Sequence, residues 1–174
     1  MNTKPLLDTT RFFDCQDDSN KLYGLDDLCK KYINDSMTIL EMGSHYGVST
    51  ELLCYYAKHV VSIDCKYNIE IEELEEKVDN LLFKHGSFSE IINSNKEDES
   101  FRFDLIYIDG LHDYENVKED ILISLPLLND GGLIAGHDFS PEYPGVEKAI
   151  REIFPNSEIE IFTDTSWLIK TNGQ

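Results

Sequence analysis

The sequence predicts an α/β protein whose single domain contains a doubly wound, mostly parallel sheet and an antiparallel hairpin at its C-terminal end. Short apolar runs alternate with segments of helical periodicity along most of the 174 residues. The runs are apolar at nearly every position, which is typical of strands that helices cover on both faces. The last two runs follow each other without an intervening helix, which indicates the hairpin.

Five apolar runs predict the parallel strands, because each is short and ends in a glycine or an aspartate. The run FDLIYIDG is the clearest of them. Two further runs, joined by Asp164-Thr165, predict the closing hairpin. We expect the seven strands, in chain order, at residues 37–43, 59–64, 81–86, 103–110, 133–138, 159–163 and 166–171.

Apolar residues three and four positions apart predict the helices. Pro144 is a typical first residue for the last of them. The expected helical segments are 21–33, 48–57, 69–79, a stripe made by Val117, Ile121 and Leu125, and 146–153. Residues 92–100 are expected to form a solvated loop and residues 129–132 a turn. Residues 1–20 are weakly patterned, so we expect a flexible N-terminal arm before a domain that spans residues 21–174.

Composition and charge exclude several classes of partner. The chain has 34 acidic and 15 basic residues, a net charge of −19, and no cluster of Lys and Arg. We therefore expect no nucleic-acid partner and no membrane partner, since phosphates and anionic lipids require clustered basic residues. No apolar run reaches the roughly 18 residues of a membrane span, and no secretion signal is recognisable. The four cysteines lack CxxC spacing, which favours reduced thiols in a cytoplasmic protein.

Glycines after the first strand and an aspartate after the second predict a nucleoside site. Ligands of doubly wound sheets bind at the carboxyl ends of the strands. Gly43 and Gly47 permit close approach of a ligand to the backbone, and Asp64 can accept both hydroxyl hydrogens of a ribose. The G-x-x-x-G spacing differs from the G-x-G-x-x-G of dinucleotide enzymes, so we expect ribose without pyrophosphate. The alternative is that both glycines are turn residues and that Asp64 caps a helix.

These positions resemble the S-adenosylmethionine (SAM) site of class I methyltransferases: Glu41-x-Gly43-x-x-x-Gly47, then Asp64, then Gly86-Ser87. The segment 108–139 resembles a narrower group, the small-molecule O-methyltransferases related to macrocin and other sugar methyltransferases, including family 24 type domains. The resemblance covers roughly residues 37–170. It implies a Rossmann-like sheet with the strand order 3-2-1-4-5-7-6.

The cofactor-binding residues that the resemblance implies all lie near the ends of the first four strands. They are Glu41, Gly43, Ser44, Gly47, Asp64, Cys65, Gly86, Ser87, Phe88 and Asp109. The two glycines of the first loop would line the methionine part of SAM, with Glu41 supporting the loop. Asp64 would bind the ribose hydroxyls, and residues 86–88 would border the adenine.

Two carboxylates and an imidazole predict a cation site. The fourth and fifth strands are expected to be neighbours about 4.8 Å apart. This brings Asp109, His137 and Asp138 together at the entrance of the predicted binding site. Such mostly oxygen ligands favour Mg²⁺, Ca²⁺ or Mn²⁺, and the histidine shifts the preference toward Mn²⁺ or Fe²⁺. The resemblance implies acidic residues that hold magnesium here, whereas His137 stands where an acid is common. A structural hydrogen bond is the alternative role for His137.

Methyl transfer also requires removal of the acceptor's proton. His112 lies three residues after Asp109, and an ordinary histidine pKa suits a general base. Asp109 and His112 are therefore the predicted catalytic residues, with a helix cap as the alternative role for His112. His45 and His85 are expected at the rim of the site.

The predicted function is SAM-dependent O-methylation of a small hydroxylated acceptor of sugar or natural-product type, assisted by a divalent metal. One alternative is a metal-independent N- or carboxyl-methyltransferase, and another is a SAM-binding module without turnover. A nicotinamide oxidoreductase is disfavoured by the glycine spacing. The chain has no insertion long enough for a lid domain, so either a second subunit of a homodimer completes the acceptor pocket or the acceptor belongs to something larger.

Overall fold

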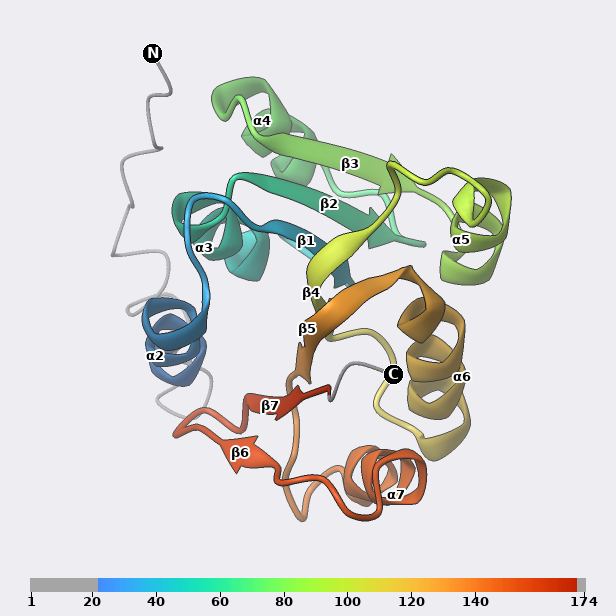
Figure 1. The fold of residues 1–174 in the computed structure, drawn as a ribbon. Helices are drawn as coiled ribbons and strands as arrows, with labels where there is room; N and C mark the ends of the chain where they lie inside the picture. The colour runs from blue at the N-terminus through green and yellow to red at the C-terminus, as the bar shows by residue number, and fades with distance from the viewer. Residues whose placement is uncertain (1–21, 172–174) are drawn as a thin grey trace.

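The computed structural model describes residues 22–171, which form a seven-stranded sheet (Figure 1). The strands are β1 (Thr38–Met42), β2 (His59–Asp64), β3 (Leu81–His85), β4 (Phe103–Ile108), β5 (Leu128–Gly136), β6 (Glu160–Ile161) and β7 (Trp167–Lys170). The helices are α2 (Tyr23–Tyr32), α3 (Val48–Tyr56), α4 (Ile69–Lys77), α5 (Phe88–Asn95), α6 (Tyr114–Ser124) and α7 (Pro144–Ile153). The strand order β3-β2-β1-β4-β5-β7-β6 confirms the prediction.

Pairing is parallel from β3 across to β5, where helices connect successive strands. β1 lies between β2 and β4, so the strand order reverses at β1. β7 runs antiparallel to both β5 and β6, which confirms the predicted hairpin. The carboxyl ends of β1, β2, β4 and β5 therefore meet at one edge of the sheet, where doubly wound folds bind their ligands.

Two apolar clusters bury the two faces of the sheet. One cluster includes Leu28 of α2 and Leu52 of α3, and the other includes Ile121 of α6 and Ile150 of α7. Figure 1 shows the same division, with α2, α3 and α4 on one side of the sheet and α5, α6 and α7 on the other. This burial explains why the strands are apolar at nearly every position.

The helix α5 was not predicted, and the expected loop at 92–100 is wrong over its first residues. Ser87 caps α5, because its hydroxyl accepts a hydrogen bond from the Glu90 backbone N–H at 3.4 Å, and Ile92 is buried beneath the helix. Ser-x-x-Glu before an apolar pair is a signature of a helix start. The sequence therefore did contain a signal for α5, and the polar residues that follow obscured it.

The expected turn at 129–132 lies inside β5, which begins at Leu128. Phe103 of β4 pairs with Leu128, but Leu105, only two residues later, pairs with Leu133. β5 therefore carries extra residues at this irregularity, and the left-handed Gly131 (φ 72°) lies among them. Asparagine, aspartate and glycine there suit a bulged strand as well as a turn, which is why the two could not be told apart.

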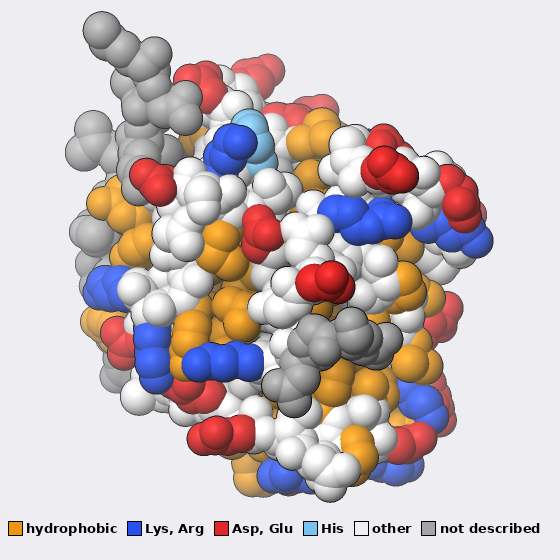
Figure 2. All heavy atoms as spheres, viewed as in Figure 1, with side chains coloured by type: hydrophobic (Ala, Val, Ile, Leu, Met, Phe, Trp, Pro, Cys, Tyr) orange, Lys and Arg blue, Asp and Glu red, His pale blue; other side chains and the backbone are white. Residues whose placement is uncertain are grey.

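Three expectations concern the arm, membranes and surface charge. The arm at residues 1–20 lies outside the described residues. Within residues 22–171, none of the helices combines the length and apolar character that crossing a membrane requires. On the face shown in Figure 2, Lys and Arg side chains are interspersed with Asp and Glu.

Candidate functional site

A pocket of about 630 Å³ opens at the carboxyl edge of the sheet, where the loops after β1 to β5 converge. Most of the predicted site residues line it: Gly43, Ser44, Asp64, Cys65, Ser87, Phe88, Asp109, His112, His137 and Asp138. Three predicted residues do not line it, namely Glu41, Gly47 and Gly86. Of the two expected rim histidines, His45 lines the pocket and His85 does not.

The two glycines of the β1 loop are needed for backbone reasons. Gly43 has φ 102°, and a Cβ placed on it would lie 2.1 Å from the carbonyl oxygen of Asp109. Gly47 has φ 76° and begins α3 as its N-cap. The β1 loop can therefore pass directly over the end of β4, which leaves backbone rather than side chains facing the pocket at Gly43.

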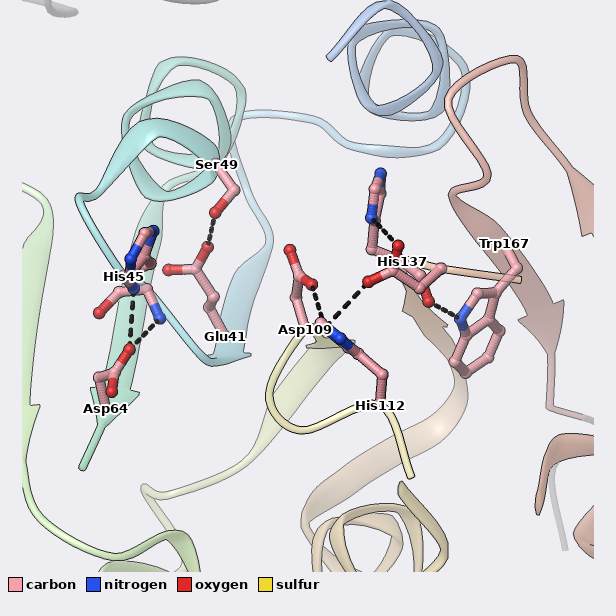
Figure 3. Close-up of polar contacts among 10 residues, drawn as sticks. Glu41, His45, Ser49, Asp64, Asp109, His112, His137 and Trp167 are labelled. Atoms are coloured by element: carbon pink, nitrogen blue, oxygen red, sulfur yellow. Dashed lines mark hydrogen bonds and ion pairs between the residues drawn. The ribbon is translucent and has the colours of Figure 1, made fainter. Parts of the chain in front are cut away.

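Glu41 lies behind this loop and is fully buried. Its carboxylate accepts hydrogen bonds from the hydroxyls of Ser49, Thr50 and Ser62 at 2.6, 2.5 and 2.6 Å, the first of which appears in Figure 3. Burial raises the pKa of Glu41 to about 7, although the three hydrogen bonds oppose that shift. Glu41 thus ties the start of α3 to β1 and β2, an arrangement that suits the implied supporting role.

Asp64 ends β2 and is already extensively hydrogen-bonded. Its Oδ2 accepts from the backbone N–H groups of Ser44 and His45 at 3.1 and 2.8 Å (Figure 3). Its Oδ1 accepts from the Lys66 backbone N–H at 2.7 Å. A carboxylate has roughly four lone-pair sites, so one remains. In this arrangement the Asp64 carboxylate can accept a hydrogen bond from one ribose hydroxyl. The sequence predicts that it accepts from both ribose hydroxyls, and this requires one of the three backbone N–H groups to give up its hydrogen bond to Asp64.

Asp109, His112 and His137, which Figure 3 labels, come together with Asp138 at the ends of β4 and β5. His112 Nε2 lies 2.9 Å from Asp138 Oδ2 and 3.8 Å from Asp109 Oδ1. His137 Nδ1 lies 3.2 Å from Asp138 Oδ1. One ligand atom each from Asp109, His137 and Asp138 lies within 4.8 Å of the other two, which is close enough for one metal ion.

Electrostatics favours positive charge at this cluster. The neighbouring carboxylates of Asp109 and Asp138 raise the pKa of His112 to about 10. Burial alone would lower the pKa of His137, but Asp138 and the charge of Asp109 raise it to about 9. Burial opposes ionisation of Asp138, yet its two histidine partners hold its pKa well below the usual range. At neutral pH the imidazoles of His112 and His137 are therefore both protonated, and the carboxylate of Asp138 between them is ionised.

The backbone of β5 fixes this cluster. The Trp167 indole N–H donates to the His137 carbonyl oxygen at 3.1 Å, as Figure 3 shows. Asp138 adopts φ 63°, a left-handed conformation that few residues other than glycine, asparagine and aspartate adopt readily. The Nε2 atom of His137 is buried and has no hydrogen-bond partner among the described residues. Such strain and unsatisfied polarity are commonly found at functional sites.

Sequence reasoning missed one wall of the pocket. Four residues on the inner side of α6 line it: Asn116, Glu119, Asp120 and Ile123. Their spacing of three and four positions indicates one helix face beside the apolar stripe that includes Val117 and Ile121. The stripe was used to predict the helix, whereas the polar face next to it was left unassigned.

Comparison with a known family gives a direct match. Residues 40–139 match the sequence profile of the type 24 methyltransferase family, described as a methyltransferase domain. The match spans β1 to the end of β5 and includes both the glycine loop and the Asp109–Asp138 cluster. No curated protein matches the chain in sequence.

Solved structures share the fold at low sequence identity. CalS11, a TDP-rhamnose 3'-O-methyltransferase of calicheamicin biosynthesis, aligns with a TM-score of 0.67 and 18% identity, over 84% of this chain and 76% of CalS11. An O-methyltransferase from Bacillus cereus in complex with SAH (S-adenosylhomocysteine) aligns with a TM-score of 0.59 and 18% identity, over 77% of this chain and 74% of that one.

MycE, a methyltransferase of mycinamycin biosynthesis in complex with Mg, SAH and mycinamycin VI, aligns with a TM-score of 0.63 and 15% identity. The alignment covers 92% of this chain, which spans about half of MycE (51%). The profile match and the sheet order agree with each other, and the chain accordingly belongs to the methyltransferase-domain family as a class I SAM-dependent methyltransferase.

Proposed function

We propose that this methyltransferase transfers a methyl group from SAM to a hydroxyl of a small acceptor, of sugar or natural-product type, with a divalent cation at Asp109, His137 and Asp138. The observation that carries the proposal is the convergence of these three side chains on one wall of the pocket. CalS11, which acts on a TDP-sugar, and MycE, which binds Mg, support the acceptor class and the cation.

The residues fit a cation. Two carboxylates and an imidazole suit Mg²⁺ or Mn²⁺. Asp109 and Asp138 already attract the protonated Nε2 of His112, at 3.8 and 2.9 Å. His137 in addition has a buried Nε2 without a partner among residues 22–171. When bound, a divalent cation would lower the pKa of an acceptor hydroxyl. It would also compete with the protons on His112 and His137, since a histidine must be neutral to bind a metal.

The remaining requirements fall on the chain's own residues. The β1 loop and Asp64 hold SAM, while Tyr46, Leu111 and Tyr143 at the pocket rim border the acceptor. Transfer forms a bond between the acceptor oxygen and the methyl carbon and breaks the bond between that carbon and the sulfonium. The products are a methyl ether and SAH, and the hydroxyl proton passes to a base.

His112 is the base we assign, subject to one condition. Its Nε2 faces both carboxylates at the pocket, within reach of an acceptor held there. With a pKa of about 10 it carries a proton at neutral pH, so it must lose that proton before it can accept another. Asp109, whose Oδ1 lies 3.8 Å from the same nitrogen, then helps to orient the imidazole.

The test is transfer of a labelled methyl group from SAM to a panel of TDP-sugars and small hydroxylated natural products, with EDTA and again with Mg²⁺ or Mn²⁺. We expect an O-methylated product that EDTA abolishes and added metal restores. Product formation that EDTA does not affect would contradict the metal assignment and favour the metal-independent alternative. Labelling at nitrogen or at a carboxylate would contradict the hydroxyl assignment.

A further inference from the structure

Asp120 is a buried carboxylate on the inner face of α6 that the mechanism above does not use. It is only 7% exposed and lines the pocket. No hydrogen bond or ion pair reaches it from the rest of residues 22–171, and burial raises its pKa to about 7. Since a buried carboxylate without a donor is unfavourable, a ligand that supplies a donor would be bound favourably.

The surroundings of Asp120 define the shape of that ligand. A Cβ placed on Gly110 would lie 2.9 Å from Cε2 of the Phe88 ring and 3.4 Å from Oδ2 of Asp120. The aromatic ring and the carboxylate therefore lie side by side against the Gly110 backbone, and Ile123 adds apolar surface to the same pocket. A flat aromatic base with an amino group at its edge matches these groups.

The charges near Asp120 are of its own sign. Glu119 and Asp113 both disfavour its ionisation, and no cation is paired with it. Above pH 7 Asp120 is mainly ionised and can only accept hydrogen bonds, so a ligand group that faces it there must be a donor.

We propose that Asp120 accepts a hydrogen bond from the exocyclic 6-amino group of the SAM adenine, and that this contact selects adenine over 6-oxopurines. Phe88 lines the pocket at the start of α5, while Asp64 at the end of β2 serves the ribose. The 6-amino group of the adenine then donates a hydrogen bond to the carboxylate of Asp120. Hypoxanthine carries an oxygen at that position, which cannot donate. The inference rests on SAM occupying this pocket.

The test compares two ligands by calorimetry well above pH 7, where Asp120 is ionised. They are SAH and S-inosylhomocysteine, which differ at position 6 of the purine and in the hydrogen that hypoxanthine carries on N1. For the wild type we expect SAH to bind about 10- to 100-fold more tightly, the usual effect of one hydrogen bond to a charged group. In Asp120→Asn we expect this preference to fall below about threefold, because an amide can donate to the 6-oxo group as well as accept.

The matched control is Glu115→Gln, on the same helix but outside the residues that line the pocket. This variant removes the same charge from an exposed side chain of α6 and should keep the wild-type preference. Equal affinity of the wild type for the two ligands would overturn the proposal without any variant. An unchanged preference in folded Asp120→Asn, verified by its melting temperature, would overturn it too. If the wild type binds neither ligand, SAM binding in this pocket fails and the inference fails with it.

Discussion

The Nε2 atom of His112 lies 2.9 Å from Oδ2 of Asp138, so the loop after β4 and the end of β5 are joined by an ion pair. This contact contributes to both pKa shifts, together with Asp109 for His112 and His137 for Asp138, because each partner stabilises the charged form of the other. It also shows that the acidic end of the pocket already holds a positive charge. A divalent cation at the same carboxylates has to compete with that charge.

Replacement of Asp138 should weaken metal binding. We expect Asp138→Asn to lower the affinity for Mn²⁺ by at least about tenfold, since the variant loses a charged ligand. Asparagine tolerates the left-handed backbone at this position, so the fold should persist. Electron paramagnetic resonance of free Mn²⁺ measures the affinity. Glu152→Gln, which removes a charge that pairs with Lys118 on the surface, is the control. Equal affinity in the two variants would exclude Asp138 as a ligand.

A side chain at Gly43 should destabilise the protein. Gly43→Ala places a Cβ 2.1 Å from the Asp109 carbonyl oxygen on a backbone with φ 102°, so we expect a loss of more than about 3 kcal/mol. Gly131→Ala is the control, because φ there is 72° but nothing lies within 4 Å of the added Cβ. Its cost should be about 1–2 kcal/mol. Urea unfolding measures both, and similar costs would show that the contact between the β1 loop and β4 is not tight.

The buried Glu41 should make stability depend on pH. Its pKa is about 7 in the folded protein against the ordinary 4.5. Between these values the folded state binds more protons, so this contribution to stability is full below pH 4.5 and is lost as the pH rises through 7.

Removing that ionisation should flatten the pH profile. We expect Glu41→Gln to reduce the fall in unfolding free energy over this range by about 2–3 kcal/mol. Asp120, whose pKa is also about 7, contributes in the same direction and keeps part of the fall. Urea unfolding at several pH values measures both proteins, and parallel profiles would contradict the assignment.

The sheet and the ends of its strands could be predicted because they follow from local pattern. Apolar runs that end in glycine or aspartate indicate buried parallel strands, and their carboxyl ends gather at one edge. This reasoning placed Asp109, His137 and Asp138 together, and the structure brings them within 4.8 Å. It could not show that His112 lies between the two carboxylates, because that position depends on the path of the loop after β4.

The role of α6 and the state of Asp64 could not be predicted for a related reason. Asp120 acquires meaning only when Phe88 and Gly110, from two other loops, pack beside it. Asp64 was predicted from its place after β2, but the three N–H groups that occupy it come from loop geometry. Contacts between distant segments decide such features, and periodicity contains no information about them.

The most direct test is a calorimetric titration of SAM into the wild type and into Asp64→Ala, with melting temperatures as the control for folding. The account predicts one site per chain in the wild type, and loss of binding in a variant that remains folded. Absence of binding to the wild type, or undiminished binding to Asp64→Ala, would contradict the claim that the pocket at the carboxyl edge of the sheet is the SAM site.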